Sequence, residues 1–180
     1  MRILPFSALR GYVKAGPFLP WTFCCRREIE AVRGRAWGLW FEMKPFAILD
    51  HTADIGLTIH GDTLNSLFEH AGEGFFYLIT DTGKIEPRVE RQIQLAGEAL
   101  ERLLVDWLDE LLYLFEVDHL LCKEFRVESV GPQGLKATVK GEHLREGVHV
   151  IKTVIKAVTY HQIQVKETQR GWRAQIIFDL

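Results

Sequence analysis

Acidic residues end two apolar, strand-like runs that lie far apart in the sequence. The first run, F-A-I-L-D-H-T-A-D-I-G at residues 46–56, contains Asp54, and the second, I-I-F-D-L at 176–180, contains Asp179 and ends at Leu180. If the two strands pair, both side chains and the terminal carboxylate of Leu180 converge and repel one another unless a proton or a cation lies among them. Oxygen anions without a nearby cysteine suit a hard divalent cation, so these three residues are a candidate calcium or magnesium site.

A simpler interpretation of the first run stays open at this point. Asp50 and Asp54 could be turn residues that bond the local backbone, with His51 bonded to a carbonyl group. Asp62 likewise fits a turn or a helix cap. The remaining acidic candidates are expected on solvated faces of helices, and they are Glu69, Glu73, Asp106 and Glu110.

A second group of polar side chains occurs in K-A-V-T-Y-H at residues 156–161. Strand alternation would place Lys156, Val158 and Tyr160 on one face, and Lys152 has the same parity. Two lysines on one face could contact a phosphate or the acidic surface of a partner. An ordinary edge strand protected by lysines explains the same pattern. The stretch alone does not decide between these interpretations.

The sequence contains no established catalytic motif. It has no GxxxxGK[ST] or GxGxxG phosphate loop, no GxSxG elbow and no HExxH pair. Its three cysteines form no CxxC pair. An enzyme acting alone is therefore hard to support. A metal-dependent phosphoesterase that uses the same carboxylates would need an open coordination position and a water nucleophile.

Composition indicates one globular domain in a reducing compartment. The chain has 180 residues, 47% of them hydrophobic, and a formal net charge of −2, which argues against a polyanion-binding protein. Residues 1–42 differ from the rest, with seven basic and three acidic residues and no sustained periodicity. We expect them to be a disordered extension or a misassigned start, and the domain to span residues 43–180. The absence of an apolar run of 18 residues and the cysteine usage predict a cytoplasmic protein.

Hydrophobic periodicity predicts the elements that position these groups. Apolar residues at helical spacing predict helices over 64–79, starting near Thr63, and over 98–116. Alternation and turn signals predict strands, with hairpins around 131–134 and 167–171; the strands are expected at 46–49, 55–60, 89–95, 125–130, 135–139, 148–151, 155–165 and 172–178. The class is therefore α+β, with the two helices covering one face of a mostly antiparallel or mixed sheet.

Taken together, D-H-T-A-D at 50–54, G-D-T-L at 61–64, K-A-V-T-Y-H at 156–161 and F-D-L at 178–180 resemble the archease family. The similarity runs in order from residue 43 to residue 180. It implies a single archease-like domain that is not an enzyme but assists the GTP-dependent RNA ligase of the RtcB type in tRNA splicing and RNA repair. Archeases promote guanylylation of the ligase's histidine and allow multiple turnover.

The resemblance also implies roles for particular residues. The family's metal site maps onto Asp54, Asp179 and Leu180, which favours the cation site over the turn interpretation. We predict possible partner contacts at His51, Lys152, Lys156 and His161, with RNA reached only through the ligase. Two other classes remain as alternatives, namely the metal-dependent phosphoesterase and a chaperone-like interaction domain in which the carboxylates are structural.

Overall fold

The computed structural model describes residues 45–50, 54–97 and 99–180, which belong to one compact unit of the chain. The predicted extension at 1–42 and the candidate contact His51 lie outside these ranges. The elements in chain order are β1 (Phe46–Asp50), β2 (Asp54–Gly61), α1 (Leu64–Ile79), a 3₁₀ turn η1 (Thr82–Lys84), β3 (Val89–Leu95), α2 (Leu100–Glu116), β4 (Leu120–Gly131), β5 (Gly134–His143), β6 (Ala157–Thr168) and β7 (Gly171–Asp179).

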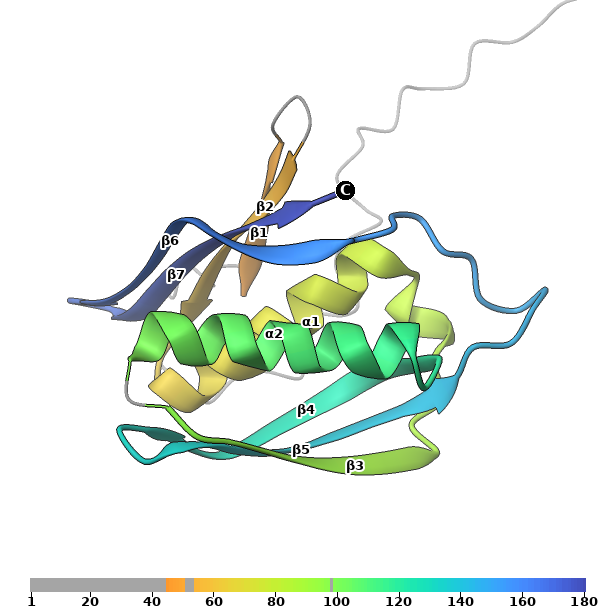
Figure 1. Cartoon of the computed structure of the whole chain (residues 1–180), viewed down its shortest axis with the longest axis horizontal. Coiled ribbons are helices and arrows are strands. Elements are labelled where there is room, and N and C mark those ends of the chain that lie inside the picture. The colour runs from red at the N-terminus through yellow and green to blue at the C-terminus, as the bar shows by residue number, and fades with distance from the viewer. Residues whose placement is uncertain (1–44, 51–53, 98) are drawn as a thin grey trace, which may run out of the picture. The chain divides into compact units, whose positions relative to one another are not determined.

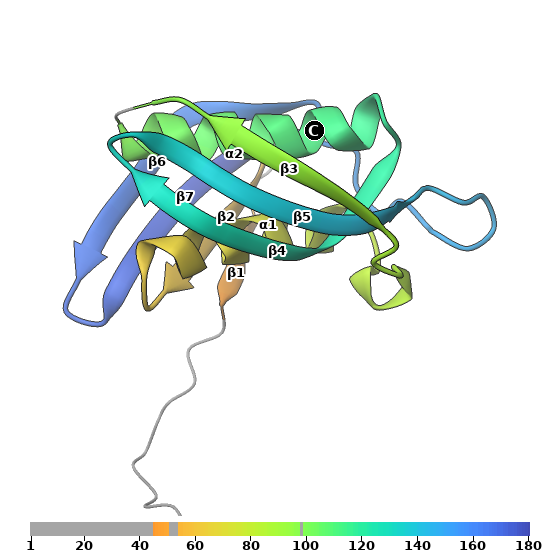
Figure 2. The ribbon, with the colours of Figure 1, turned by 90° about the horizontal axis from the view of Figure 1, so that it is seen from below.

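The strands form two sheets with the helices between them. One sheet has the order β1-β2-β7-β6 and the other the order β3-β5-β4, and every pairing is antiparallel. Figures 1 and 2 show α1 and α2 as a layer between the sheets. The α+β class is confirmed. The sequence did not predict the second sheet. Its presence agrees with α2, because buried residues occupy more than one side of this helix and each side must pack against another element.

The start of α1 is confirmed at the predicted residue. Thr63 is the N-cap, and its hydroxyl oxygen accepts a hydrogen bond from the Ser66 amide at 3.1 Å. The Thr63 amide in turn donates to the Ser66 hydroxyl at 3.0 Å, which completes a capping box. The helix ends at Ile79, as the periodicity predicts. The hairpins at 131–134 and 167–171 are also confirmed, with Gly134 and Gly171 supplying positive φ angles of 111° and 99°.

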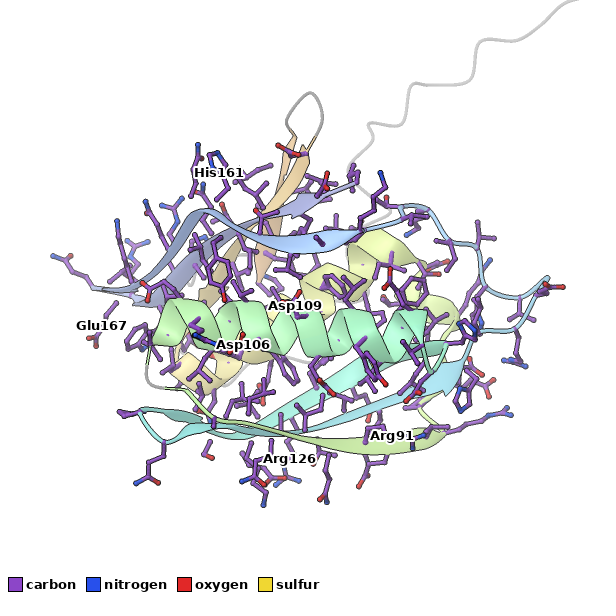
Figure 3. All side chains as sticks on the ribbon, in the orientation of Figure 1. Arg91, Asp106, Asp109, Arg126, His161 and Glu167 are labelled. Carbon is purple, nitrogen blue, oxygen red and sulfur yellow. The ribbon has the colours of Figure 1, made fainter. Side chains whose placement is uncertain are left out.

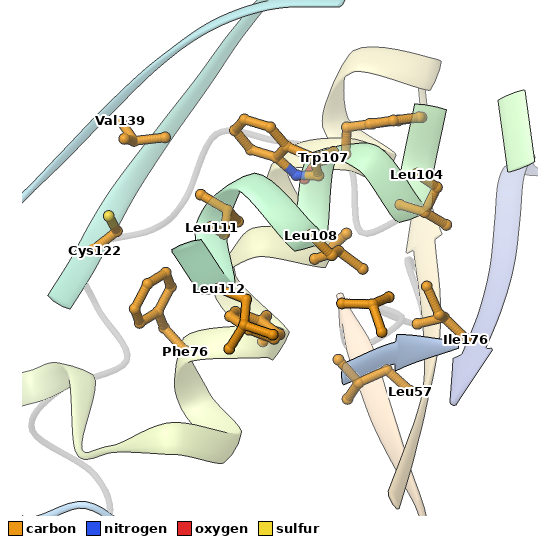
Figure 4. Packing of buried hydrophobic residues seen from close by; sticks show 14 of the residues in the cluster. Leu57, Phe76, Leu104, Trp107, Leu108, Leu111, Leu112, Cys122, Val139 and Ile176 are labelled. Carbon is orange, nitrogen blue, oxygen red and sulfur yellow. The ribbon is translucent and has the colours of Figure 1, made fainter. Parts of the chain in front are cut away.

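Trp107 of α2 belongs to the hydrophobic core (Figure 4). Its side chain is fully buried, and its indole Nε1 donates a hydrogen bond to the Phe68 carbonyl at 3.0 Å, which joins α2 to α1. Figure 4 shows Leu57 and Ile176 of one sheet and Cys122 and Val139 of the other around the same helix. Burial raises the pKa of the Cys122 thiol to about 12, so this cysteine packs as a small hydrophobic residue.

The predictions for residues 148–165 are only partly correct. Residues 148–151 form no strand but a single bridge, Thr80 to Ile151, and β6 begins at Ala157, after Lys156. Within β6, the four residues 160–163 lie between the pairs Thr159–Ile177 and Gln164–Gln175, opposite one residue of β7. This bulge, in which Gln162 has a φ of 53°, breaks the alternation. Val158 is therefore buried and Tyr160 exposed, so the prediction that they share a face is wrong.

A buried polar cluster holds the start of the segment between β5 and β6. The Glu142 carboxylate accepts hydrogen bonds at Oε1 from the Glu86 amide at 2.8 Å and from His149 Nε2 at 3.1 Å. Its Oε2 lies 2.9 Å from Arg145 Nη2. His149 Nδ1 accepts from the Arg145 amide at 3.1 Å, which assigns the proton to Nε2. Burial acts to raise the pKa of Glu142, but the Glu86 amide, His149 and Arg145 outweigh it and lower this pKa.

We expect the stability contributed by Glu142 to depend on pH. Because its pKa is lower in the folded state, the contribution is complete above the ordinary value of 4.5 and is lost as the pH falls through the lowered pKa. Glu142→Gln should reduce the free energy of unfolding at pH 7 by about 1–3 kcal/mol. The difference from wild type should shrink below pH 4.5 in urea titrations. The exposed Glu146→Gln is the control. A Glu142→Gln difference that stays constant down to pH 3 would contradict this assignment.

Candidate metal corner and partner surface

The pairing of β2 with β7 brings together the two acidic strand ends. Asp54 is the direct cross-strand partner of Asp179, and Leu180 follows immediately. Directly opposite residues of antiparallel strands project from the same face of a sheet, so both side chains share one face. Asp54 is half-buried and Asp179 is exposed. The pairing on which the predicted site depended is therefore confirmed, and we call Asp54, Asp179 and Leu180 the acidic corner.

Lys156 is bound directly to this corner. Its backbone amide donates to the Asp179 carbonyl oxygen at 2.9 Å, and its Nζ donates to an oxygen of Leu180 at 2.6 Å. The ammonium group therefore supplies one positive charge where negative charges gather. The sequence analysis grouped Lys156 with other outward side chains and missed this contact. The contact depends on the position of Leu180 in the folded structure, which local sequence patterns do not give.

The chemistry of the corner fits a hard cation. Like charges directly opposite across two strands are destabilising unless something compensates them, and carboxylate oxygens are the ligands that calcium and magnesium prefer. Among the described residues no three His, Cys, Asp or Glu side chains are grouped closely enough to hold an ion. A cation at this corner would therefore need the carboxylate of Leu180 in addition to Asp54 and Asp179. The ligand assignment stays a prediction.

The other predicted partner contacts, Lys152 and His161, lie in different surroundings. Lys152 Nζ donates to the Thr80 carbonyl at 2.9 Å and lies 5.1 Å from the centre of the Tyr77 ring, so it fastens its segment to the end of α1. His161 is exposed in the β6 bulge and points away from α2 (Figure 3). The side chains of His161, Lys152 and Lys156 are all exposed, and the two lysines also make intramolecular contacts.

Among the remaining acidic candidates, Glu69 and Glu73 are less solvated than predicted. Glu69 is half-buried, and its Oε1 accepts a hydrogen bond from the Val127 amide at 2.8 Å. Burial, with the nearby Glu69 charge, raises the pKa of Glu73 despite the opposing effect of His70. The expectation of a solvated helix face is therefore wrong for Glu69 and Glu73. Glu69 contacts β4, and Glu73 lies near His70 and Glu69. Helical periodicity alone does not predict these contacts.

Asp106 and Glu110 of α2 are likewise only half-exposed, whereas Asp62 lies where the sequence placed it. Asp62 is exposed directly before the N-cap of α1 and fits a turn residue. Asp106 and Asp109 both lie on α2 (Figure 3). Burial raises the pKa of Asp109, the charge of Asp106 raises it further, and a hydrogen bond from the Val158 backbone opposes both.

Comparison with known proteins identifies the class. A family model described as the Archease protein family (MTH1598/TM1083) matches residues 46–180. "Protein archease" of Methanosarcina acetivorans is 44% identical over 141 residues, 76% of this chain and 97% of that protein. "Protein archease" of Pyrococcus furiosus is 37% identical over 142 residues, 77% of this chain and 100% of that protein.

A solved structure agrees with these sequence relationships. The solution structure of Methanobacterium thermoautotrophicum protein 1598 has a TM-score of 0.67 and 35% identity, and the match covers 77% of this chain and all of that one. The α+β domain that contains the acidic corner therefore has the fold of this solved structure. The chain belongs to the archease family. None of the helices in the described ranges combines the length and apolar character that crossing a membrane requires.

Proposed function

We propose that this chain is an accessory protein of a GTP-dependent RNA ligase of the RtcB type. It promotes guanylylation of the ligase and thereby allows multiple turnover in the cytoplasm, and it contacts RNA only through the ligase. The observation that carries this proposal is the register that pairs Asp54 with Asp179 beside Leu180 in a chain of the archease family. An acidic corner at a sheet end suits contact with a cation- and nucleotide-binding partner.

In this proposal Asp54, Asp179 and the carboxylate of Leu180 hold a divalent cation, calcium or magnesium. The bound ion supplies positive charge that offsets the mutual repulsion of the carboxylates. Lys156 positions Leu180 through the 2.6 Å contact between Nζ and the Leu180 oxygen. It also reduces the net negative charge at the corner. The protein's own residues thus place and balance the carboxylates before a cation or a partner arrives.

A turnover assay tests the proposal against its alternatives. A purified cognate ligase with GTP and cleaved RNA is expected to stop after about one turnover alone and to continue when this protein is added, because the accessory protein restores the guanylylated state. The protein by itself should neither join RNA nor hydrolyse GTP. Metal-dependent release of phosphate by the protein alone, with no effect on the ligase, would favour the phosphoesterase. No effect in either assay would favour a chaperone-like interaction domain.

A further inference from the structure

The segment 148–156, between β5 and β6, alternates strictly between inward and outward residues. One set is buried or half-buried and consists of His149, Ile151, Thr153 and Ile155. The other set is exposed and consists of Val148, Val150, Lys152, Val154 and Lys156. Val150 and Val154 are 63% and 62% exposed, although β-branched apolar residues normally occupy covered strand positions. The segment thus has the side-chain pattern of a strand with an apolar and basic outer row, and we call it the 148–156 edge.

The Val148 and His149 amides donate to the Arg145 carbonyl at 3.2 and 3.1 Å, and from Val150 to Lys156 the backbone is bonded along one side only. The Lys152 amide donates to the Ile79 carbonyl at 2.8 Å, the Lys156 amide donates to Asp179 at 2.9 Å, and the Thr80 hydroxyl donates to the Val150 carbonyl at 2.8 Å. All three contacts use even-numbered residues. In extended backbone, successive residues direct their polar groups to opposite sides. The amides of the odd-numbered residues Ile151, Thr153 and Ile155 therefore point to the other side.

Those odd-numbered amides have no partner in the described part of the chain. The N–H groups of Ile151, Thr153 and Ile155 donate no hydrogen bond to any described backbone or side-chain oxygen. A row of unpaired donors at every second residue is the property by which a sheet edge accepts a further strand. Since the segment is anchored at Ile79 and Asp179, this row is held in place before any partner binds.

We propose that the 148–156 edge is the docking site for an extended segment of the partner ligase, which adds to it as a β-strand. This inference rests on the proposed function. Backbone hydrogen bonds to Ile151, Thr153 and Ile155 would give affinity, and the outer row would select the sequence. Cross-strand neighbours lie on the same face, so a row of valines and lysines fits a segment in which apolar and acidic residues alternate.

Charge argues for such a segment over a second copy of this chain. The 148–156 edge contains two lysines and no acidic residue, so an identical strand offers no opposite charge. Two lysines are also too few for strong binding to a nucleic-acid backbone, which needs many phosphate contacts. Each ammonium group has three N–H donors, so Lys152 and Lys156 can keep their contacts to Thr80 and Leu180 and still meet a carboxylate.

The position of the edge links docking to the acidic corner. Lys156 ends the edge and contacts both Asp179 and Leu180. A strand bound along the edge would therefore have one end beside the corner. Docking would place the ligase near the residues that the proposed function requires, while most of the binding free energy comes from a surface outside the corner.

Three variants test this inference. Val150→Thr with Val154→Thr keeps the branched shape of both exposed side chains but removes the apolar surface. Thr153→Pro removes one free amide, a change that a sheet edge tolerates where the N–H faces outward. Val117→Thr is the matched control, because Val117 is also exposed, at 55%, but lies at the end of α2. The measurements are the Kd for the purified cognate ligase, ligase turnover, and hydrogen exchange of the backbone amides.

We expect the double threonine variant to weaken ligase binding about tenfold, and Thr153→Pro at least as much, with the control within about twofold of wild type. Ligase should slow exchange at Ile151, Thr153 and Ile155. If wild type activates the ligase and both variants bind and activate equally well, the docking edge is wrong and the proposed function stands. If wild type leaves turnover unchanged, the proposed function fails. The docking edge is then tested with a synthetic peptide of alternating valine and glutamate. If millimolar peptide leaves hydrogen exchange at the amides of Ile151, Thr153 and Ile155 unchanged, the docking edge is wrong.

Discussion

A tag fused after Leu180 is expected to abolish the stabilisation of this protein by calcium or magnesium. The fusion replaces the terminal carboxylate by a neutral amide, which removes one of three anionic groups and adds bulk at the acidic corner. Affinity for hard cations depends on the number and charge of oxygen ligands, so this single change should weaken binding strongly. It also turns the Leu180 oxygen that accepts from Lys156 Nζ at 2.6 Å into a neutral amide oxygen. An N-terminal tag of the same sequence is the control.

Asp54→Asn and Asp179→Asn are expected to weaken cation binding, as the C-terminal tag does. Neither substitution is expected to destabilise the metal-free protein. Each substitution removes a negative charge from a directly paired, like-charged position, so the metal-free variants should melt at the same temperature as wild type or higher. Wild type should gain about 2.7 kcal/mol at a cation concentration a hundredfold above its Kd, and the variants should gain almost nothing. Ligase activation should fall in parallel.

A thermal-shift series with titrated calcium and magnesium measures all of these changes together. Asp62→Asn, at the exposed turn before α1, should keep the full response of wild type. If the tagged protein and both Asn variants retain the cation-dependent shift and the ligase activation, the acidic corner is not a cation site. If the shift is lost while activation persists, the cation stabilises the fold but has no part in the effect on the ligase.

Trp107→Ala is expected to cause the largest loss of stability among single substitutions in α2. The side chain is fully buried, packs edge-on against Phe125 with ring centroids 6.4 Å apart, and donates to the Phe68 carbonyl. Truncation leaves a cavity between the helices and the three-stranded sheet and removes the hydrogen bond to the Phe68 carbonyl, which together should lower the free energy of unfolding by about 3–5 kcal/mol.

Two further substitutions separate the contributions of packing and hydrogen bonding. Trp107→Phe keeps much of the apolar volume but removes the donor, so it should show a smaller loss than Trp107→Ala. Tyr113→Ala, on the same helix but 53% exposed, should change the stability by no more than about 0.5 kcal/mol. Urea unfolding followed by fluorescence and circular dichroism gives all three values. A Trp107→Ala protein as stable as the Tyr113→Ala protein would refute this role.

The sequence predicted local structure well because local chemistry determines it. Thr63 and Ser66 cap α1, and the apolar spacing over 64–79 gives its length. The pairing of β2 with β7 was predicted only conditionally, since periodicity carries no information on which strands meet. The second sheet, the β6 bulge and the contact between Glu69 and Val127 all depend on packing between distant segments. The contact of Lys156 with Leu180 belongs to the same group.

The position of β7 also has a consequence for the order in which the domain is made. β7 follows all other described strands in the sequence, yet it lies between β2 and β6 in the interior of its sheet. During synthesis, β2 can pair with β1 and pack on α1, but its other edge has no partner until β7 leaves the ribosome. An unpaired edge favours association with other chains, and pairings between distant segments form slowly. Until β7 has been synthesised, nascent chains of this protein should therefore be prone to such association.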